Sequence, residues 1–387
     1  MHTHFCGIDI SKDGFHAALI DALGRPIWSR GFPMSLPGFR DLLAAVQPSM
    51  TLLGLESTGV YGLNLFSFLH DQGCDVRILN PLLIANYARL SLRQTKTDKR
   101  DALTIAEFLK QSASTLPQSP PAHDGLRALA RERESLSSQI VAAKNEIKRL
   151  LHVLFPESLK LLNPFAASSL KLFVAFPSKD AIAQAPPEAL RKIWSGGHGR
   201  KPTLTLSRLL DASRSSVGIA SPAYESILQS KIRVFLLLNQ ELELVTDRLI
   251  QGCRDQASQE MSLLASINGL GDVTTAHFVA ETHGRTFSKV KKLIAFSGLD
   301  PIIKESGQWK GKGKISKRGS RSLRRLLFLM STLVIRNNPV FRELYDRKRG
   351  EGKRYRQAVL AVAHKLLRVI HSMLRYRRPF NPIYQYS

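Results

Sequence analysis

Four acidic residues in three short motifs are the side chains of this sequence best suited to chemistry. They are Asp9 in GIDISK, Glu56 in GLESTG, and Asp98 and Asp101 in KTDKRD. Carboxylates that converge repel one another unless a divalent cation neutralises them. Together, these motifs therefore predict a site for Mg²⁺ or Mn²⁺, where the ions would polarise a scissile phosphodiester.

Taken singly, each carboxylate also fits a structural role. A hydrogen bond to a loop amide would satisfy Asp9 within its apolar strand, and Asp98, after Thr97, could simply cap a helix. Asp98 and Asp101 are, however, three residues apart and so share one helix face. The combination of four acids favours the metal site over four separate structural roles.

The elements around these acids predict an α/β domain with a mixed sheet over residues 1–112. The order of elements, with acids on the first strand, the fourth strand and a late helix, resembles the RuvC-like branch of the ribonuclease-H-like fold. A Ser- and Pro-rich linker follows at 113–125. Strands are expected at 5–10, 15–20, around 26–30, 51–55 and 76–79, and helices at 39–46, 61–72, 82–92 and 98–112.

Apolar residues with three-and-four spacing predict a long helical arm over residues 126–255. The seam begins at Leu126 and includes one charged position, Arg133. A second long helix over 232–249 would pair with the first or with another protomer, as a coiled coil or within an ordinary helical bundle. Between them, residues 156–222 are rich in Pro, Ser and Gly and are expected to form a short helical insert.

The chain is strongly basic, with 56 Lys and Arg against 31 Asp and Glu in 387 residues, a formal net charge of +25. Such an excess indicates nucleic acid or an anionic membrane as a partner. The longest apolar run, 326–335, is too short to span a bilayer, and no signal sequence or amphipathic anchor is evident. Nucleic acid is therefore the expected partner. Cys6, Cys74 and Cys253 show no metal-ligand spacing and are expected to be packing residues.

The excess charge is concentrated in a predicted helical C-terminal domain, residues 261–387. Between Arg285 and Arg378 there are 26 Lys or Arg and 5 Asp or Glu. Near its start, INGLGDVTTA fits a helix-hairpin-helix, in which Gly269 and Gly271 form a tight turn whose amides contact a DNA phosphate. The alternative is a plain Gly-rich turn between two helices.

A serine followed by glycine, Ser306, lies in a predicted loop crowded with cations. Such a loop could expose a nucleophilic hydroxyl and hold a phosphate. Ser297, Ser316 and Ser320 are equally polar neighbours, and the residue types alone do not choose among them. The cations expected to contact nucleic acid here are Lys310, Lys312, Lys314, Lys317, Arg318, Arg321, Arg324 and Arg325.

Taken with GLDP, ESG and ISKRG in the C-terminal domain, the acidic motifs make the whole chain resemble the IS110 family of transposases, in the group that includes the IS1111 type. The resemblance implies a bacterial, cytoplasmic, nucleoid-associated enzyme. It assigns the DEDD carboxylates to Asp9, Glu56, Asp98 and Asp101, and the catalytic serine to Ser306.

The implied reaction is Mg²⁺-dependent DNA strand cleavage and exchange through a serine–DNA covalent link. The resemblance further implies element ends and a target site as DNA partners, guided by a non-coding bridge RNA. Dimers would assemble into tetramers, with a site composed of the acidic domain of one protomer and the serine of another.

Two other functions agree with the same residues. A RuvC-type endonuclease would hydrolyse DNA junctions with metal-activated water and no protein nucleophile, so it would keep cutting after Ser306→Ala. A non-catalytic nucleic-acid-binding scaffold would use the carboxylates structurally, and Asp9→Ala and Asp98→Ala would then leave its biological activity unchanged.

Overall fold

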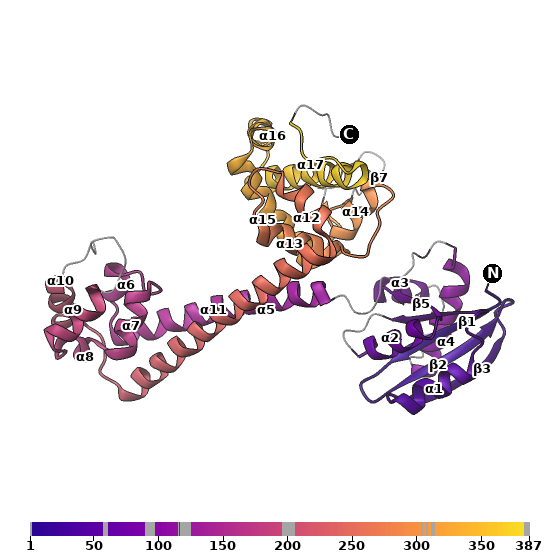
Figure 1. Ribbon diagram of the computed structural model, residues 1–387, viewed down its shortest axis with the longest axis horizontal. Helices are drawn as coiled ribbons and strands as arrows, with labels where there is room; N and C mark the ends of the chain where they lie inside the picture. The colour runs from indigo at the N-terminus through magenta and orange to yellow at the C-terminus, as the bar shows by residue number, and fades with distance from the viewer. Residues whose placement is uncertain are drawn as a thin grey trace. The chain divides into compact units, whose positions relative to one another are not determined.

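The computed structural model describes residues 2–56, 61–89, 97–114, 116, 125–195, 206–302, 305–306, 309–310 and 314–382. The chain divides into two compact units, residues 1–124 and 125–387 (Figure 1). The first carries a mixed sheet and the second is mainly helical, so the expected fold class, a mixed α/β part with a mainly helical remainder, is confirmed.

The first unit is built on a five-stranded sheet in the order β3-β2-β1-β4-β5. The hairpins β1–β2 and β2–β3 are antiparallel, whereas β1 pairs with β4 and β4 pairs with β5 in parallel. This is the mixed sheet predicted above, and it is compatible with a ribonuclease-H-like domain. The strands are β1 (His4–Ile10), β2 (Gly14–Asp21), β3 (Pro26–Pro33), β4 (Thr51–Glu56) and β5 (Asp75–Leu79).

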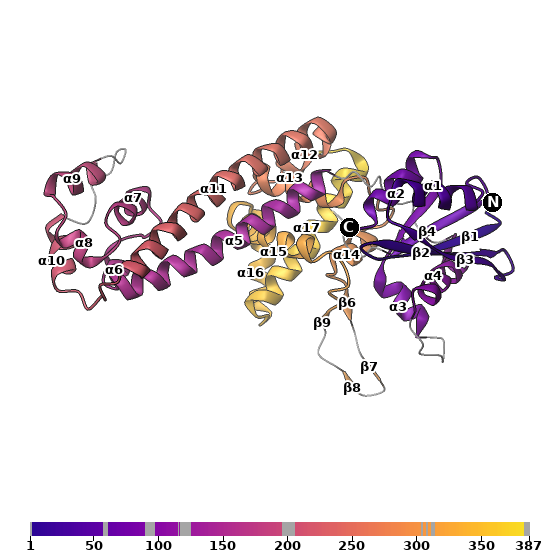
Figure 2. The same cartoon turned by 90° about the horizontal axis from the view of Figure 1, so that it is seen from below.

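Helices cover both faces of this sheet (Figure 2). On one face, α1 (Leu36–Ala45) and α2 (Leu63–Asp71) bury a cluster with Cys6 and Ile8 of β1. On the other, α3 (Pro81–Ala88) and α4 (Asp98–Ser112) pack against Phe5. Because side chains alternate along a strand, the odd-numbered residues of β1 face α4.

The second unit contains two long helices that lie side by side, α5 (Gly125–Leu154) and α11 (Pro222–Gln256) (Figures 1 and 2). Seven of the nine positions of the predicted α5 seam are buried. At the charged position, Arg133 Nε donates to Thr246 Oγ1 at 3.1 Å. The two helices thus pair within one chain, and their description as a coiled coil stays a prediction.

The residues between these helices form a small helical cluster with its own core. Leu172 and Phe173 pack with Ile147 and Leu151 of α5 and with Ile232 of α11. The helices here are α6 (Ser158–Leu161), α7 (Ala167–Ala175), α8 (Lys179–Ala183), α9 (Pro187–Ser195) and α10 (Leu206–Arg214).

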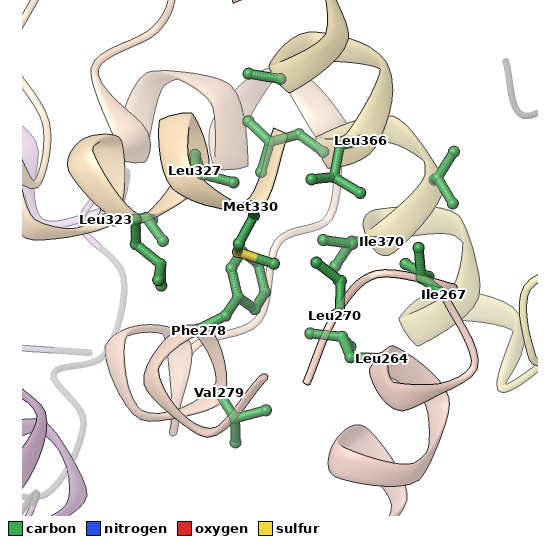
Figure 3. Packing of buried hydrophobic residues seen from close by; sticks show 14 of the residues in the cluster. Leu264, Ile267, Leu270, Phe278, Val279, Leu323, Leu327, Met330, Leu366 and Ile370 are labelled. Atoms are coloured by element: carbon green, nitrogen blue, oxygen red, sulfur yellow. The ribbon is translucent and has the colours of Figure 1, made fainter. Parts of the chain in front are cut away.

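The other end of the α5–α11 pair joins a larger helical body (Figures 1 and 2), whose core is seen in Figure 3. Phe278 of α13 packs on Met330 of α15 and Ile370 of α17 at its centre. Its elements are α12 (Ser258–Ala265), α13 (Asp272–Thr282), α14 (Val290–Ser297), α15 (Arg321–Asn337), α16 (Pro339–Gly350) and α17 (Tyr355–Tyr376), with β6 (Pro301–Ile302), β7 (Glu305–Ser306), β8 (Trp309–Lys310) and β9 (Lys314–Ile315) between α14 and α15.

Among the described residues, none of the helices is both long enough and apolar enough to cross a membrane. The three cysteines are buried, as expected of packing residues.

Candidate active site and nucleic-acid interface

Strand register brings Asp9 and Glu56 together. β1 and β4 are parallel neighbours, and their ladder runs from His4 opposite Thr51 to Ile8 opposite Leu55. One further step along both strands places Asp9 beside Glu56. Asp9 lies two residues after Gly7, and Glu56 lies two residues after Gly54. Because both glycines are on the sheet face covered by α4, the two carboxylates point to that same face.

Two paired glycines set how closely α4 lies on the sheet. Gly7 of β1 is opposite Gly54 of β4. A Cβ added at Gly7 would overlap the Ala102 carbonyl oxygen and the Ala106 nitrogen, and one at Gly54 would lie 2.6 Å from Leu109 Cδ1. The absence of a side chain at Gly7 and Gly54 therefore allows α4 to lie close against β1 and β4.

The close contact at Gly7 places the first turn of α4 over Asp9. Two strand residues advance about 6.6 Å and four helix residues advance about 6 Å. Stepping from Gly7 to Asp9 therefore corresponds to stepping back from Ala102 to Asp98 along the helix. Asp9 and Asp98 do line the same open cavity, of about 370 Å³.

The electrostatics of Asp9 show that the four carboxylates share this end of the sheet. Burial, together with the nearby carboxylates of Asp101, Asp98 and Glu56, raises the pKa of Asp9 to about 6. A carboxyl group in this setting gains from a neighbouring positive charge. The carboxylates of Glu56, Asp98 and Asp101 are thus near enough to Asp9 to act on its charge.

The carboxylates fit a divalent cation in chemistry but are not drawn into a closed ligand shell. Over the described parts of the chain, no three His, Cys, Asp or Glu side chains are grouped so as to hold a metal ion. The donor set consists of oxygen atoms alone, which suits Mg²⁺ or Mn²⁺ rather than a soft metal. Residues 57–60 and 90–96, next to Glu56 and ahead of α4, lie outside the described residues.

The structure adds one residue to this site that the sequence analysis missed, His16. It pairs with Asp9 across the β1–β2 hairpin and lines the same cavity. Its Nε2 lies 2.9 Å from Ser29 Oγ, and burial lowers its pKa, against the opposing effect of Asp98. Counting back from the Ser11–Gly14 turn would have found it, since the hairpin register follows from the turn.

Ser306 lies in the second unit on a projecting ladder, not in the loop that was predicted. β7 pairs with β8, and Ser306 is opposite Trp309. β6 pairs with β9 nearer the helical body. Figure 2 shows these strands extending away from α14 and α15. The serine is therefore carried on a hairpin outside the hydrophobic core.

Two of the family-like motifs, GLDP and ISKRG, meet at the base of this hairpin. The Ser316 hydroxyl donates to the Asp300 carboxylate, and the Ser316 amide donates to the Asp300 carbonyl at 2.8 Å. Gly298 adopts a left-handed φ of +67°, and a Cβ on Gly319 would overlap the Phe296 carbonyl oxygen. Ser316 thus has a structural role, and Ser297 is buried with its hydroxyl donating to Ile294 O at 2.7 Å.

Ser320 too is committed to structure. It caps α15, since its hydroxyl oxygen accepts from the Leu323 amide at 3.1 Å, and it donates to Glu281 Oε2 at 3.1 Å. Of the four serines that the sequence left open, three therefore have hydroxyls engaged in structural hydrogen bonds, while Ser306 lies on the outer ladder of the hairpin.

The predicted nucleic-acid contacts fall into two groups. Lys314, Lys317, Arg318 and Arg321 are exposed beside the hairpin base. Arg324 Nη1, in contrast, donates to Ser297 O at 3.4 Å, and Arg325 pairs with Glu134 of α5 at 3.1 Å. Lys312 lies outside the described residues, and the side chain of Lys310 is not described.

The predicted helix-hairpin-helix corresponds to α12, a turn and α13. Gly269 has a φ of +103° and closely approaches Leu333 O, and Gly271 is the residue before α13. The first residue of α13 is Asp272, which pairs with Arg254 at 2.8 Å. A phosphate would meet this carboxylate at the helix start, so DNA contact at Gly269 and Gly271 stays a prediction.

Comparison with known proteins agrees with this arrangement. Residues 6–156 match a transposase family model, that of the DEDD transposases of IS110, and residues 261–346 match the model described as the transposase IS116/IS110/IS902 family. The first match includes all four carboxylates, and the second runs from α12 into α16 and includes the Ser306 hairpin.

Two relatives align with this chain over nearly its whole length. The chain is 26% identical to the pilin gene-inverting protein of Moraxella bovis, over 98% of both proteins. It is 25% identical to the uncharacterized 43.6 kDa protein of insertion element IS110 from Streptomyces coelicolor, over 96% of this chain and 94% of that protein. The chain belongs to the IS110 family of transposases, which are DNA transposases or site-specific recombinases whose DEDD domain indicates a divalent-metal dependence.

Proposed function

We propose that the protein cleaves and exchanges DNA strands of an insertion sequence through a serine–DNA covalent link. One observation carries the proposal: strand register and the Gly7–Gly54 pair bring Asp9 and Glu56, at the ends of two neighbouring strands, close to Asp98 and Asp101 of α4. The Moraxella relative is named for inverting a pilin gene, which agrees with recombination rather than simple degradation.

In this proposal, the four carboxylates hold Mg²⁺ or Mn²⁺, which when bound supplies Lewis-acid polarisation of the scissile phosphate. Ser306 Oγ attacks phosphorus, the bond from phosphorus to the 3′ oxygen breaks, and the serine proton is balanced by the proton gained by that oxygen. The products are a 5′-phosphoserine link and a free 3′ hydroxyl. Reversal on a second strand conserves the bond energy.

The exposed cations near the hairpin base support the binding of DNA there. Lys317, Arg318 and Arg321 are exposed, and phosphate contact by such side chains gives affinity without reading sequence. A bridge RNA would account for a cationic surface larger than one DNA duplex needs. The role of a bridge RNA is tested by asking whether RNA that copurifies with the protein is needed for recombination. Recombination by RNA-free protein would contradict this role.

Oligomer formation has support on α11. Ile227, Val234, Leu237 and Leu244 are 43%, 46%, 55% and 50% exposed and lie within about 100° of one helix face. Such a stripe suits the arm of a second copy. The variant Val234→Glu/Leu237→Glu should reduce the oligomer measured by light scattering, and an unchanged mass contradicts the assignment.

The central experiment traps protein on end-labelled DNA of the element's own ends. We expect a covalent adduct that contains the 5′ label, requires Mg²⁺ or Mn²⁺, disappears in Ser306→Ala and persists in the control Ser138→Ala, which removes an exposed hydroxyl from α5. Continued cutting by Ser306→Ala would favour the RuvC-type endonuclease. Recombination retained by Asp9→Ala would favour the non-catalytic scaffold.

A further inference from the structure

A cavity between α16 and α17 is lined by a concentration of cations that the proposed reaction does not use. It has a volume of about 610 Å³. Arg347 and Lys348 enter it from the last turn of α16, and Lys365 and Arg368 enter it from the middle of α17. Among the described residues that line it, Glu343 is the one carboxylate.

The cations of this cavity are close enough to repel one another. Burial, followed by the positive charges of Arg368 and Arg347, lowers the pKa of Lys365. Lys348 Nζ contacts the Glu351 carboxylate at 2.7 Å, which offsets one charge at the rim. His364 also lines the cavity, and burial lowers its pKa, so it adds no charge at neutral pH. Four basic side chains therefore stand against the two carboxylates of Glu343 and Glu351, and this excess of positive charge favours an anionic occupant.

The position of the cavity relates it to the Ser306 hairpin. His364 makes a hydrogen bond with the backbone of Leu299. Leu299 is buried and lies two residues before β6, at the base of the hairpin, where Asp300 binds Ser316. One wall of the cavity therefore contacts the segment that supports the proposed nucleophile.

We propose that the cleft between α16 and α17 binds the sugar–phosphate backbone of duplex DNA next to the strand presented to Ser306. This inference rests on the proposed function for the placement of the hairpin, but the binding itself requires no cleavage. Lys365 and Arg368 would contact phosphates from α17, and Arg347 would contact them from α16. These contacts are independent of sequence, because phosphates carry no base information.

The test measures binding of the full-length protein to fluorescent 30-base-pair duplexes in chelator, where cleavage is off. In Lys365→Gln/Arg368→Gln we expect Kd at ~0.1 M salt to rise about tenfold, and the slope of log K against log salt to shrink by about 2. The loss should be equal for an element end and an unrelated duplex. The matched control Lys231→Gln/Arg233→Gln removes two exposed cations from α11 and should change Kd less than twofold.

Several outcomes would overturn the inference. These are an unchanged salt slope in the α17 double variant, an equal loss in the α11 control, or a loss confined to structured RNA. If the double variant melts early, the single exposed Arg347→Gln must still reduce the slope by about 1. Because the assay needs no adduct, absence of a Ser306 adduct would refute the proposed function while leaving this result intact.

Discussion

The two candidate catalytic regions are held in place by different means. Asp9 and Glu56 lie at the ends of two interior strands, and Asp98 and Asp101 lie on α4, whose contact with the sheet is set by a buried core; Asp9 itself is half-buried. Ser306 lies on a two-residue ladder beyond the core, anchored through Asp300 and Ser316 at its base. The carboxylate site depends on packing, and the serine depends on a few hydrogen bonds, so substitutions should affect stability at the first and mainly geometry at the second.

The largest expected effect is that of Gly7→Ala. An added Cβ has no space against Ala102 and Ala106, so α4 must move away from the sheet. We expect a loss of about 3 kcal/mol in the free energy of unfolding of the first unit, together with loss of the adduct. The matched control is Gly31→Ala on β3, where a Cβ would meet only His16 Nδ1 at 3.7 Å. Equal stability of the two variants, measured by denaturant unfolding, would contradict the role of the glycine pair.

Asp9→Asn should separate activity from stability. Recombination should be lost, yet the metal-free protein should gain about 1 to 2 kcal/mol at pH 7.5, after allowing for the solvent that reaches this half-buried side chain. The sign follows from the raised pKa of about 6: an ordinary carboxyl, with a value of 3.8, ionises first in the unfolded chain. The contribution of the Asp9 carboxyl to folding stability is therefore fully present below pH 4 and is lost as the pH rises through about 6.

Melting curves of wild type and Asp9→Asn at pH 4.5 and pH 7.5 measure this difference. The gap between the two proteins should widen with pH in chelator and narrow when Mg²⁺ is added. A gap that is the same at both pH values would show that Asp9 is not electrostatically strained by its neighbours.

Gly319→Ala should affect geometry more than stability. Its Cβ would overlap the Phe296 carbonyl oxygen and the Gly298 nitrogen, which displaces the hairpin base. We expect the rate of covalent adduct formation to fall about 10- to 100-fold, because a small misplacement of a nucleophile slows its reaction strongly. The affinity for DNA should remain within threefold. Gly350→Ala, where a Cβ meets nothing within 4 Å, is the control and should leave the rate unchanged.

The smallest effects should come from the helix caps. Thr97 caps α4 through the Arg100 amide at 3.3 Å, and Ser320 caps α15 through the Leu323 amide at 3.1 Å. Each substitution to Ala should cost about 1 kcal/mol. In calorimetry, Thr97→Ala should lower the melting temperature of the first unit, and Ser320→Ala should lower the melting temperature of the second. A common shift of both transitions would mean that the two units unfold together.

Much of the first unit could be predicted from its sequence because its signals are local. Alternation in residues 5–10 and 15–20 identified the β1–β2 hairpin, and the order of strands and helices indicated the mixed sheet. The insert at 156–222 was less predictable, since its helices are short and their apolar residues become a core only when packed on α5 and α11. The hairpin at 301–315 escaped prediction because its strands have two residues each, too few for any periodicity.

The sequence by itself determined the chemical inventory: four carboxylates in three motifs, a basic C-terminal domain, and two long amphipathic helices. These follow from residue type and short-range spacing, which are properties of the chain. Tertiary structure alone decided that Gly7 and Gly54 lie side by side beneath α4 and that α5 pairs with α11 of its own chain. Register and helix approach depend on contacts between residues far apart in the chain, and only packing chooses among them.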